Sequence, residues 1–369
     1  MRGKTSDYGE GREGQGEVIQ ISISPASLKD LDSSEELLQS GWWGSFKQAH
    51  GWRAHPFLVT VASAGGREMA FGLLVLTRAL LRHLMIAYVP FGPIHDPVCE
   101  RGELLSGLAG ALRVHLPRGT LLLRFDLPWE KAGEEPAWAG KGLAVRKSAS
   151  DIQPPNTVVV DISGPLDNVL ASMKPKTRYN VRLSEKKGVT VQEEGPAGLS
   201  AWYAMYRETS QRDRIAIHSL SYYRGLLVDG GSYPGEKPIV TLLTARHEGD
   251  LLAGNIYIFW KKRGVYLTGA SSNAKRNLMP TYALQWEGMQ RAKQAGCVEY
   301  DLHGIPPAPD PDHPMFGLYQ FKTGFSDRTV QRWGTWDVAY RPLLCTLYRI
   351  AEEARLFWFR SVKKRLRRR

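Results

Sequence analysis

The stretch that decides the fold is RGVYLTGASSNAKRNLMPTYALQWEGMQRAKQAGCVEYDLHG, residues 263–304. It begins with a strand pattern over residues 263–272 and ends with a second strand pattern over residues 297–304. Between them, residues 281–295 have the spacing of an amphipathic helix, with leucine, methionine and alanine side chains on its apolar side. Strands that alternate with a helix are typical of an α/β unit, in which helices cover a sheet.

Strand patterns continue on both sides of this stretch. Residues 238–260 contain two more strands and residues 329–340 another, and the earlier part of the chain has helix patterns at residues 26–40 and 102–115. The strand patterns of that earlier part are residues 17–24, 57–63, 69–77, 84–93 and 120–128. Each half therefore mixes helices with a sheet built largely from hairpins, so the sequence predicts two similar α/β units.

A chain of 369 residues is long for one hydrophobic core and suits two domains of about 150 residues each. We expect the first domain at residues 18–160 and the second at residues 161–345. Residues 1–17, rich in glycine and charge, are expected to form a disordered N-terminus. Residues 346–369 are expected to form a basic amphipathic C-terminal helix.

The sequence lacks the patterns of a metal site, a disulfide framework or a phosphate-binding loop. Its three cysteines lie far apart with no CxxC pair, which favours a reducing compartment. Walker A, GxSxG and HExxH motifs are absent, and we expect neither a cofactor nor a metal. No apolar run has the form of a signal peptide or the length of a bilayer span, so a cytoplasmic location is expected.

The positive charge is concentrated in two segments. The formal net charge is +12; residues 174–187 hold six basic residues and one acid, and residues 346–369 hold nine basic residues and two acids. The rest of the chain is therefore neutral overall, and the two segments indicate two contacts with anionic partners.

The first basic segment is KPKTRYNVRLSEKKG, residues 174–188. Pro175 suits the first turn of a helix and Gly188 suits its C-cap, so residues 175–187 are predicted to be helical. Its basic residues at a four-residue spacing are Arg178, Arg182 and Lys186. Such a stripe can follow a sugar–phosphate backbone, while a neighbouring apolar line of Tyr179 and Leu183 is expected to dock the helix. The alternative is a surface helix whose charges are only solvated.

The second basic segment combines aromatic residues with a dense basic cluster. Its apolar residues are Leu356, Phe357, Trp358 and Phe359. This combination is typical of an interfacial anchor, with aromatic rings at the level of the lipid headgroups and basic side chains on anionic lipid. The sequence thus predicts peripheral contact with an anionic membrane, at the inner face of the cytoplasmic membrane. The alternative is a disordered basic tail after a helix that packs on the second domain.

Four stretches, with the basic helix between the second and third, resemble one known family. They are QSGWWGSFKQAHGW (39–52), AYVPFGPIHDP (87–97), YRETSQRDRIAIHSLSYY (206–223) and the segment 265–325, which ends in GLYQFKTGF. In this order and spacing they resemble the FemABX family of aminoacyl-tRNA-dependent peptidyltransferases, which add amino acids to the stem peptide of bacterial peptidoglycan precursors. The resemblance implies two acetyltransferase-like (GNAT) domains with the acceptor site between them, and no long coiled-coil arm.

The resemblance also implies the reaction centre. In the family the Phe-Lys pair of the FK.GF motif lies there, which places Phe321 and Lys322 in catalysis. Attack of an amine on an aminoacyl ester builds an oxyanion, and a fixed ammonium nearby stabilises it. Asp126 matches the family's strand-end aspartate, a proton acceptor; the alternative is a capping residue. His303 stands where relatives usually have glycine, and we expect it to be structural.

The same resemblance supplies the substrate-binding positions. Lys47 matches the lysine that contacts the acceptor's diphosphate, and Tyr319 belongs to the catalytic motif. His218 and Thr268 stand where a relative has arginine and tyrosine, and Leu121 replaces a second tyrosine, so the contacts to a nucleotide-linked precursor differ here. The expected tRNA-binding residues are Lys174, Lys176, Arg178, Arg182 and Lys186.

The expected activity is transfer of an amino acid from aminoacyl-tRNA to the side-chain amine of a peptidoglycan precursor stem peptide, which forms an interpeptide bridge. The precursor is either lipid-linked or nucleotide-linked. Two alternatives stay open at this point. One is an acyl-CoA-dependent N-acyltransferase, to whose pyrophosphate loop GKGLAVRK near Gly140 bears a faint likeness. The other is a non-catalytic scaffold that binds RNA or a membrane.

Overall fold

The computed structural model describes residues 19–63, 65–94, 100–131, 133, 136, 145–213, 215–228 and 232–358. The expected disordered segment 1–17 and residues 359–369 of the expected basic helix lie outside this part of the chain.

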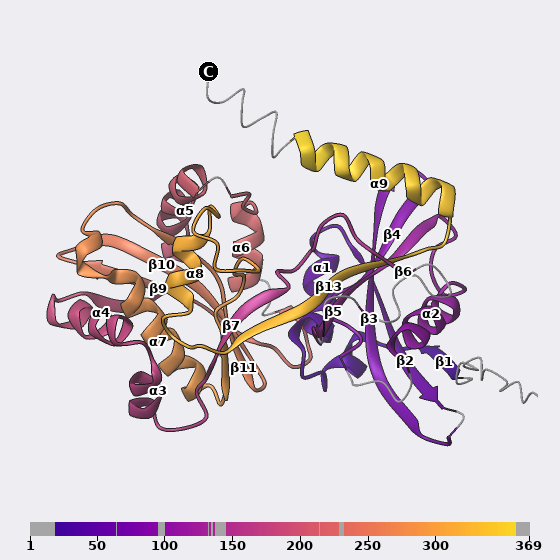
Figure 1. Cartoon of the computed structure of the whole chain (residues 1–369), viewed down its shortest axis with the longest axis horizontal. Helices are drawn as coiled ribbons and strands as arrows, with labels where there is room; N and C mark the ends of the chain where they lie inside the picture. Colours follow the sequence, from indigo (N-terminus) through magenta and orange to yellow (C-terminus); the bar gives the residue numbers. More distant parts are fainter. Residues whose placement is uncertain are drawn as a thin grey trace, which may run out of the picture.

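Within the described residues, thirteen strands form one sheet that runs through both halves of the molecule (Figure 1). The strands of the first half are β1 (Gln20–Pro25), β2 (Arg53–Ala62), β3 (Glu68–Leu81), β4 (Leu84–Val89), β5 (Thr120–Glu130) and β6 (Val145–Lys147). Those that follow are β7 (Asn156–Asp161), β8 (Thr190–Glu194), β9 (Ile239–His247), β10 (Asp250–Trp260), β11 (Arg263–Ser271), β12 (Glu299–Asp301) and β13 (Thr329–Ala339). Their spatial order is β1-β2-β3-β4-β5-β13-β7-β12-β11-β10-β9-β8, with β6 also paired to β13. Only the β4·β5 and β11·β12 pairs among them are parallel.

Strand β13 joins the two halves. Its first residues, Thr329 to Gln331, pair with β7, whereas its later residues, Gly334 to Ala339, pair with β5. Trp333, Trp336, Val338 and Tyr340 pack in the core of the first half. The chain therefore returns to the first half near its end, where β13 lies between β7 and β5 in the sheet. The boundary expected between the two domains stays a prediction.

Helices cover both halves of the sheet. The α-helices are α1 (Gly41–Gln48), α2 (Arg101–Leu112), α3 (Leu166–Ser172), α4 (Pro175–Lys186), α5 (Leu199–Asp213), α6 (Leu220–Leu227), α7 (Pro280–Gln294), α8 (Phe316–Lys322) and α9 (Pro342–Phe357). The 3-10 turns are η1 (Leu28–Leu31), η2 (Leu37–Gln39), η3 (Pro196–Gly198) and η5 (Arg276–Leu278). Helix α2 packs in the core of the first half, and α7 packs in the core of the second.

The helix expected over residues 26–40 is wrong. The structure has only the turns η1 and η2 there, because side chains between them bond to the local backbone. The Ser34 hydroxyl donates to the carbonyl of Glu36 and accepts from its N–H, and the Glu36 carboxylate accepts from the N–H of Leu38. Serine and acidic side chains that bond to the nearby backbone in this way compete with helix formation.

A third core cluster holds the two halves together as one body. It contains Trp42, Trp43 and Phe46 of α1, strand residues of β3 and β10, and Trp202 and Tyr223 of α5 and α6. Aromatic side chains each bury a large area, so this cluster fixes the relative position of the halves.

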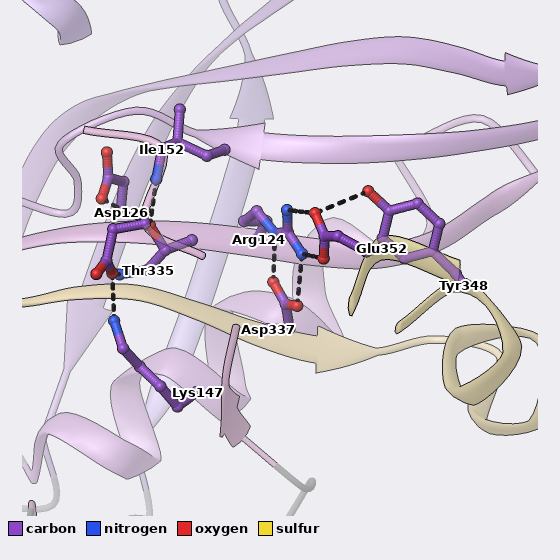
Figure 2. A network of polar contacts seen from close by, with 9 residues as sticks. Arg124, Asp126, Lys147, Ile152, Thr335, Asp337, Tyr348 and Glu352 are labelled. Carbon is purple, nitrogen blue, oxygen red and sulfur yellow. Dashed lines mark hydrogen bonds and ion pairs between the residues drawn. The ribbon is translucent and has the colours of Figure 1, made fainter. Parts of the chain in front are cut away.

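Helix α9 is fastened to the first half by a buried ion network (Figure 2). The Arg124 guanidinium donates to both carboxylate oxygens of Asp337, at 2.7 and 2.8 Å, and to both of Glu352, at 3.0 Å. All three side chains are buried. Removing one partner of such a network leaves an uncompensated buried charge. The ion pair with Arg124 therefore keeps the side of α9 that carries Glu352 turned toward the first half.

Candidate active site

Lys322, at the end of α8, has a buried amine that points at the main chain of another loop. It is 4% exposed, and its Nζ donates to the carbonyls of His303 at 2.7 Å and Gly304 at 2.8 Å. The Tyr266 ring lies 5.4 Å from the same atom. Burial lowers the pKa of Lys322 from 10.5 to about 7, although the negative charge of Asp301 acts in the opposite direction. The residue therefore gains and loses its proton near neutral pH.

The loop that holds Lys322 is itself held by Asp301, at the end of β12. The buried Asp301 carboxylate accepts a hydrogen bond from the His303 N–H at 2.7 Å and another from the Thr157 hydroxyl. His303 adopts a left-handed backbone conformation with φ +56°, which a glycine would take more readily. Burial lowers the pKa of the His303 imidazole to about 4, so the ring is neutral. The main-chain carbonyl of His303, and not its imidazole, accepts the hydrogen bond from Lys322.

Asp126 lies on β5, in the first half of the molecule, whereas Lys322 lies on α8, in the second half. Its buried carboxylate accepts a hydrogen bond from the Tyr88 hydroxyl at 3.0 Å. It accepts another from the Thr335 hydroxyl at 3.1 Å (Figure 2). Burial raises the pKa of Asp126 to about 7, while hydrogen bonds from Tyr88 and Thr335 act against that rise. These contacts are those of an interior carboxylic acid, not of a capping residue.

A short bridge connects the surroundings of Asp126 and Lys322. The backbone of Gln153 lies close enough to the Asp126 carboxylate to act against the rise in its pKa. The next residue, Pro154, packs so closely on Gly304 that a Cβ added there would lie 3.2 Å from the proline ring. Gly304 supplies one of the two carbonyls that hold Lys322. The Asp126 carboxylate and the Lys322 amine therefore both border the junction between the two halves.

Lys47, on α1, lies in a cage of aromatic rings. Its Nζ is 5.3 Å from the Trp43 ring, 5.6 Å from Trp52 and 5.8 Å from Tyr222. Burial, followed by the charge of Arg78, lowers the pKa of Lys47 to about 8. His218 stacks on Tyr222, one of these three rings, with 4.0 Å between ring centroids.

His218 and Lys47 are close enough to affect each other's charge. Partial burial and then the charge of Lys47 lower the pKa of His218. The structure thus brings together two expected substrate-binding residues that are far apart in the sequence.

The aromatic cluster extends from Lys47 in two directions. Toward β5, the Trp52 ring lies 6.0 Å from Tyr88, the hydroxyl partner of Asp126. Toward β11, Tyr222 contacts Tyr223, which contacts Tyr206 at 5.8 Å between ring centroids. The Thr268 hydroxyl donates to the Tyr206 hydroxyl at 2.5 Å. Lys47, His218, Thr268 and Asp126 therefore border one aromatic band.

Two expected positions contribute little to this band. Tyr319 is half-buried against the core of the second half, and its carbonyl accepts from Thr323. Leu121 is buried, and its carbonyl accepts from the main chain of Tyr340 and Arg341. Neither side chain contacts Lys47 or Asp126 within the described residues.

The basic helix begins next to the Phe-Lys motif that is expected to be catalytic. The predicted helix is confirmed as α4, and Gly188 after it has φ +76°. The Lys174 N–H donates to the carbonyl of Gly324, directly after the FK motif. A cavity of about 360 Å³ lies between the two segments. Its lining includes Lys174, Lys176, Tyr282, Gln320 and Phe321. Two expected tRNA-binding lysines thus share a cavity with Phe321.

The rest of α4 differs from the expected stripe. The Arg178 guanidinium donates to the carbonyls of Ala171 and Met173, so it closes the end of α3. Arg182 and Lys186 are exposed and continue the line away from the cavity. Tyr179 is exposed too, and the docked side of α4 is polar as well as apolar, because Thr177, Asn180, Val181 and Ser184 are the buried residues. The expectation that Tyr179 docks the helix is wrong.

Several residues of the site were not identified from the sequence. Asp301 carried a usable signal, since an acid inside an apolar strand is rarely buried without a partner. Tyr266, Trp52 and Tyr222 carried none, because aromatic residues in strands and helices are most often core residues.

The described residues hold neither a metal cluster nor a membrane-spanning helix. No group of three or more histidine, cysteine, aspartate or glutamate side chains is arranged to hold a metal ion in that part of the chain. No helix there is both long and apolar enough to cross a membrane.

Known proteins resemble the chain in sequence and in fold. The sequence model of the FemAB family matches residues 137–244 and 239–353. A Lipid II:glycine glycyltransferase of Staphylococcus saprophyticus is 26% identical over 269 residues, which span 58% of this chain and 64% of that protein, just under two thirds. One of the same name from Staphylococcus epidermidis is 23% identical over 376 residues, 84% of this chain and 89% of that protein.

A crystal structure of FemX shares the fold, with a TM-score of 0.72 and 19% identity over 89% of this chain and 100% of that chain. This likeness and the two mixed α/β halves confirm the expected tandem of GNAT-like units.

Proposed function

The chain belongs to the FemAB family, and on that premise we propose that it is an aminoacyltransferase of peptidoglycan synthesis. It moves an amino acid from aminoacyl-tRNA to the side-chain amine of a precursor stem peptide and so forms an interpeptide bridge. Relatives that carry the name Lipid II:glycine glycyltransferase support a lipid-linked acceptor. The reaction would then take place in the cytoplasm, at the inner face of the membrane.

The observation that carries this proposal is the setting of Lys322. A protonated amine has three N–H donors, and the carbonyls of His303 and Gly304 take two of them. Within the described residues, the third donor is left for a substrate. In a buried site a donor of this kind stabilises a developing negative charge far more than it would in water.

The chemistry that follows needs no covalent enzyme intermediate. The neutral amine of the acceptor attacks the carbonyl carbon of the aminoacyl ester, a C–N bond forms, and the carbonyl oxygen becomes an oxyanion that accepts from Lys322. The ester C–O bond then breaks, and the proton released by the amine ends on the ribose hydroxyl of the tRNA. Asp126, with a pKa of about 7, is suited to relay that proton.

The donor side of the site is the region of α4 and α8. Lys174 and Lys176 line the cavity beside Phe321, and Arg182 and Lys186 extend the positive charge along α4. A sugar–phosphate backbone that follows this line would bring its aminoacyl end toward Phe321. Arg178 is left out, because its guanidinium is used inside the fold.

The acceptor side is the aromatic band around Lys47. A lysine that is partly desolvated by Trp43, Trp52 and Tyr222 binds an anion more tightly than a fully hydrated one. We assign it the acceptor's diphosphate, with His218 and Thr268 farther along the band.

Turnover assays with defined donors test this function against the acyl-CoA alternative. The purified chain is incubated with a panel of radiolabelled aminoacyl-tRNAs, or with acyl-CoA, and with soluble and lipid-linked precursors. We expect label on the stem peptide only with charged tRNA. Turnover with acyl-CoA alone would refute the proposal, and absence of turnover with every donor, while RNA binding persists, would favour a scaffold.

A further inference from the structure

Helix α9 has two opposite sides that differ in what covers them. Its buried or half-buried residues are Cys345, Tyr348, Arg349, Glu352 and Leu356. Its exposed large apolar residues include Leu343 (85% exposed), Leu347 (63%), Ile350 (58%), Phe357 (65%) and Trp358 (51%). In the exposed set, Leu343, Leu347 and Ile350 are four and three residues apart, and Phe357 comes seven residues, about two turns, after Ile350, so this set lies on one side of the helix. The buried or half-buried set recurs at three or four residues, apart from one adjacent pair in its middle, and lies on the opposite side. We call the exposed set the α9 stripe.

The stripe differs from the apolar cluster expected at residues 356–359. Leu356 is half-buried on the docked side of α9, and Phe359 lies outside the described residues. The exposed apolar surface instead runs the length of the helix and begins at Leu343. Contiguous apolar surface of this kind on a folded protein marks an interaction site.

Rotation of α9 about its own axis cannot bury the α9 stripe against the first half of the molecule. Glu352 is held by Arg124, and the Tyr348 hydroxyl donates to Glu352 at 3.3 Å. Turning the stripe inward would pull Glu352 out of that buried network and leave Arg124 with an unpaired charge. Figure 1 shows α9 along the outer edge of the first half, with its far end pointing away from that half.

We propose that the α9 stripe is the surface by which this protein attaches to an anionic lipid bilayer. Charge identifies the occupant: residues 360–369, which come after α9 in the sequence, contain seven lysines and arginines and no acid. An apolar stripe with aromatic residues at one end and adjacent basic residues has the two components of interfacial binding, burial in the headgroup region and attraction to anionic lipid. A second copy of the chain would bring two such basic segments together, and RNA has no use for five bare apolar side chains.

The place of α9 in the fold connects this surface with the acceptor side of the site. Leu122, Arg124 and Asp126 alternate along β5 and so point to the same face of the sheet. Helix α9 contacts the first two, through a cluster with Cys345 and through the ion network. Asp126 is the next residue on that face. Trp52, which packs against the same cluster, lies 5.6 Å from Lys47.

A bilayer bound to α9 would therefore face the edge of the aromatic band. In this respect the inference rests on the proposed function, because a lipid-linked acceptor would then present its diphosphate from the side on which Lys47 lies.

Vesicle co-sedimentation of the full chain tests the surface. Vesicles of phosphatidylcholine with phosphatidylglycerol are compared with pure phosphatidylcholine for four proteins: the natural chain, Leu347→Glu/Ile350→Glu, Lys363→Gln/Lys364→Gln/Arg365→Gln and Val114→Glu. Val114 is the matched control, an exposed apolar residue of the first half that lies outside α9. We expect the stripe variant to lose at least tenfold in vesicle affinity and the control to lose none. The basic variant should lose about fivefold for each charge removed, and only on anionic vesicles.

The outcomes distinguish a lipid bilayer from a second copy of the chain and from RNA as the partner of the α9 stripe. Unchanged vesicle binding by the stripe variant overturns the proposal. So does a natural chain that is dimeric by light scattering, becomes monomeric in the stripe variant and never binds vesicles. A basic variant that loses tRNA affinity but keeps vesicle affinity overturns the charge argument.

Activity distinguishes this proposal from the proposed function. Turnover on a short soluble acceptor should be the same for the natural chain and the stripe variant, whereas turnover on a lipid-linked acceptor in vesicles should fall in the variant. If no acceptor supports turnover, the proposed function fails while vesicle binding still decides the surface. Leu347→Phe/Ile350→Leu, which keeps the stripe apolar, should restore both vesicle binding and turnover on the vesicle acceptor.

Discussion

Replacing Lys322 with methionine tests the reaction centre most directly, since methionine has similar length but no donor. The variant loses one N–H aimed at the substrate and two that bind His303 and Gly304. Loss of one oxyanion donor typically slows the chemical step by a factor on the order of 100 to 1,000, about 3 to 4 kcal/mol. We expect a loss of at least a hundredfold in the single-turnover rate, measured with both substrates saturating.

The fold of this variant should survive, because two effects on its stability oppose each other. Burial lowers the pKa of Lys322 from 10.5 to about 7, which corresponds to roughly 5 kcal/mol against the charged form. Methionine removes that penalty but leaves two carbonyls without donors, at about 1 to 3 kcal/mol each. The melting temperature at neutral pH should therefore change by only a few degrees.

The pH dependence of stability has a definite sign. Between pH 7 and 10.5 the unfolded lysine keeps its proton while the folded one loses it, so the natural chain gains stability as pH rises through that window. The methionine variant should lack this gain. Thermal unfolding of both proteins across the window measures the difference.

The titration of Lys322 should also appear in the pH dependence of the single-turnover rate. Because the protonated amine stabilises the oxyanion, the rate of the natural chain should fall above pH 7 relative to that of the variant, whose residual rate has no such limb. A variant with a near-normal single-turnover rate, or one that keeps the alkaline limb, would remove Lys322 from the mechanism.

Three further substitutions test the surroundings of this residue. Asp301→Asn removes the charge that raises the pKa of Lys322, so the alkaline limb of the rate should move to lower pH; an unmoved limb would leave Asp301 with a structural role only. Arg182→Glu/Lys186→Glu should weaken tRNA binding. It should also reduce the slope of log affinity against log salt by roughly 0.9 for each phosphate that the variant no longer neutralises. An unchanged slope would mean that the charges of α4 are only solvated. Lys47→Met should raise KM for a diphosphate-containing acceptor at least tenfold with little change in the saturated rate; an equal effect on a stem peptide without diphosphate would contradict that assignment.

Local signals in the sequence predicted part of this structure well. Helix α4 begins at Pro175 and ends one residue before its expected end, because proline at the first turn and a glycine after the last turn act within a few residues. The burial of Lys322 could not be predicted in the same way. Its two carbonyl partners lie almost twenty residues earlier, in a loop whose shape depends on Asp301 and Thr157.

Sequence patterns also identified basic residues without revealing how each is used. Arg178 and Arg182 have the same spacing on α4, yet the first donates to the end of α3 and the second is exposed. The difference comes from the position of α3, which no pattern within α4 encodes. The α9 stripe was missed for a related reason: an apolar side of a helix normally faces a core. The ion network with Arg124 and the cluster around Cys345 show that the opposite side of α9 is docked.

The pairing of β5 with β13 has a consequence for biosynthesis. When a ribosome has made β5, its partner strand is still about two hundred residues from being translated. At about 5 to 20 residues per second, that edge stays open for roughly 10 to 40 seconds. An open, apolar strand edge is a template for pairing with other chains. A protein cut before β13 would lack the partner strand of β5, and we expect it to aggregate instead of yielding a separable domain.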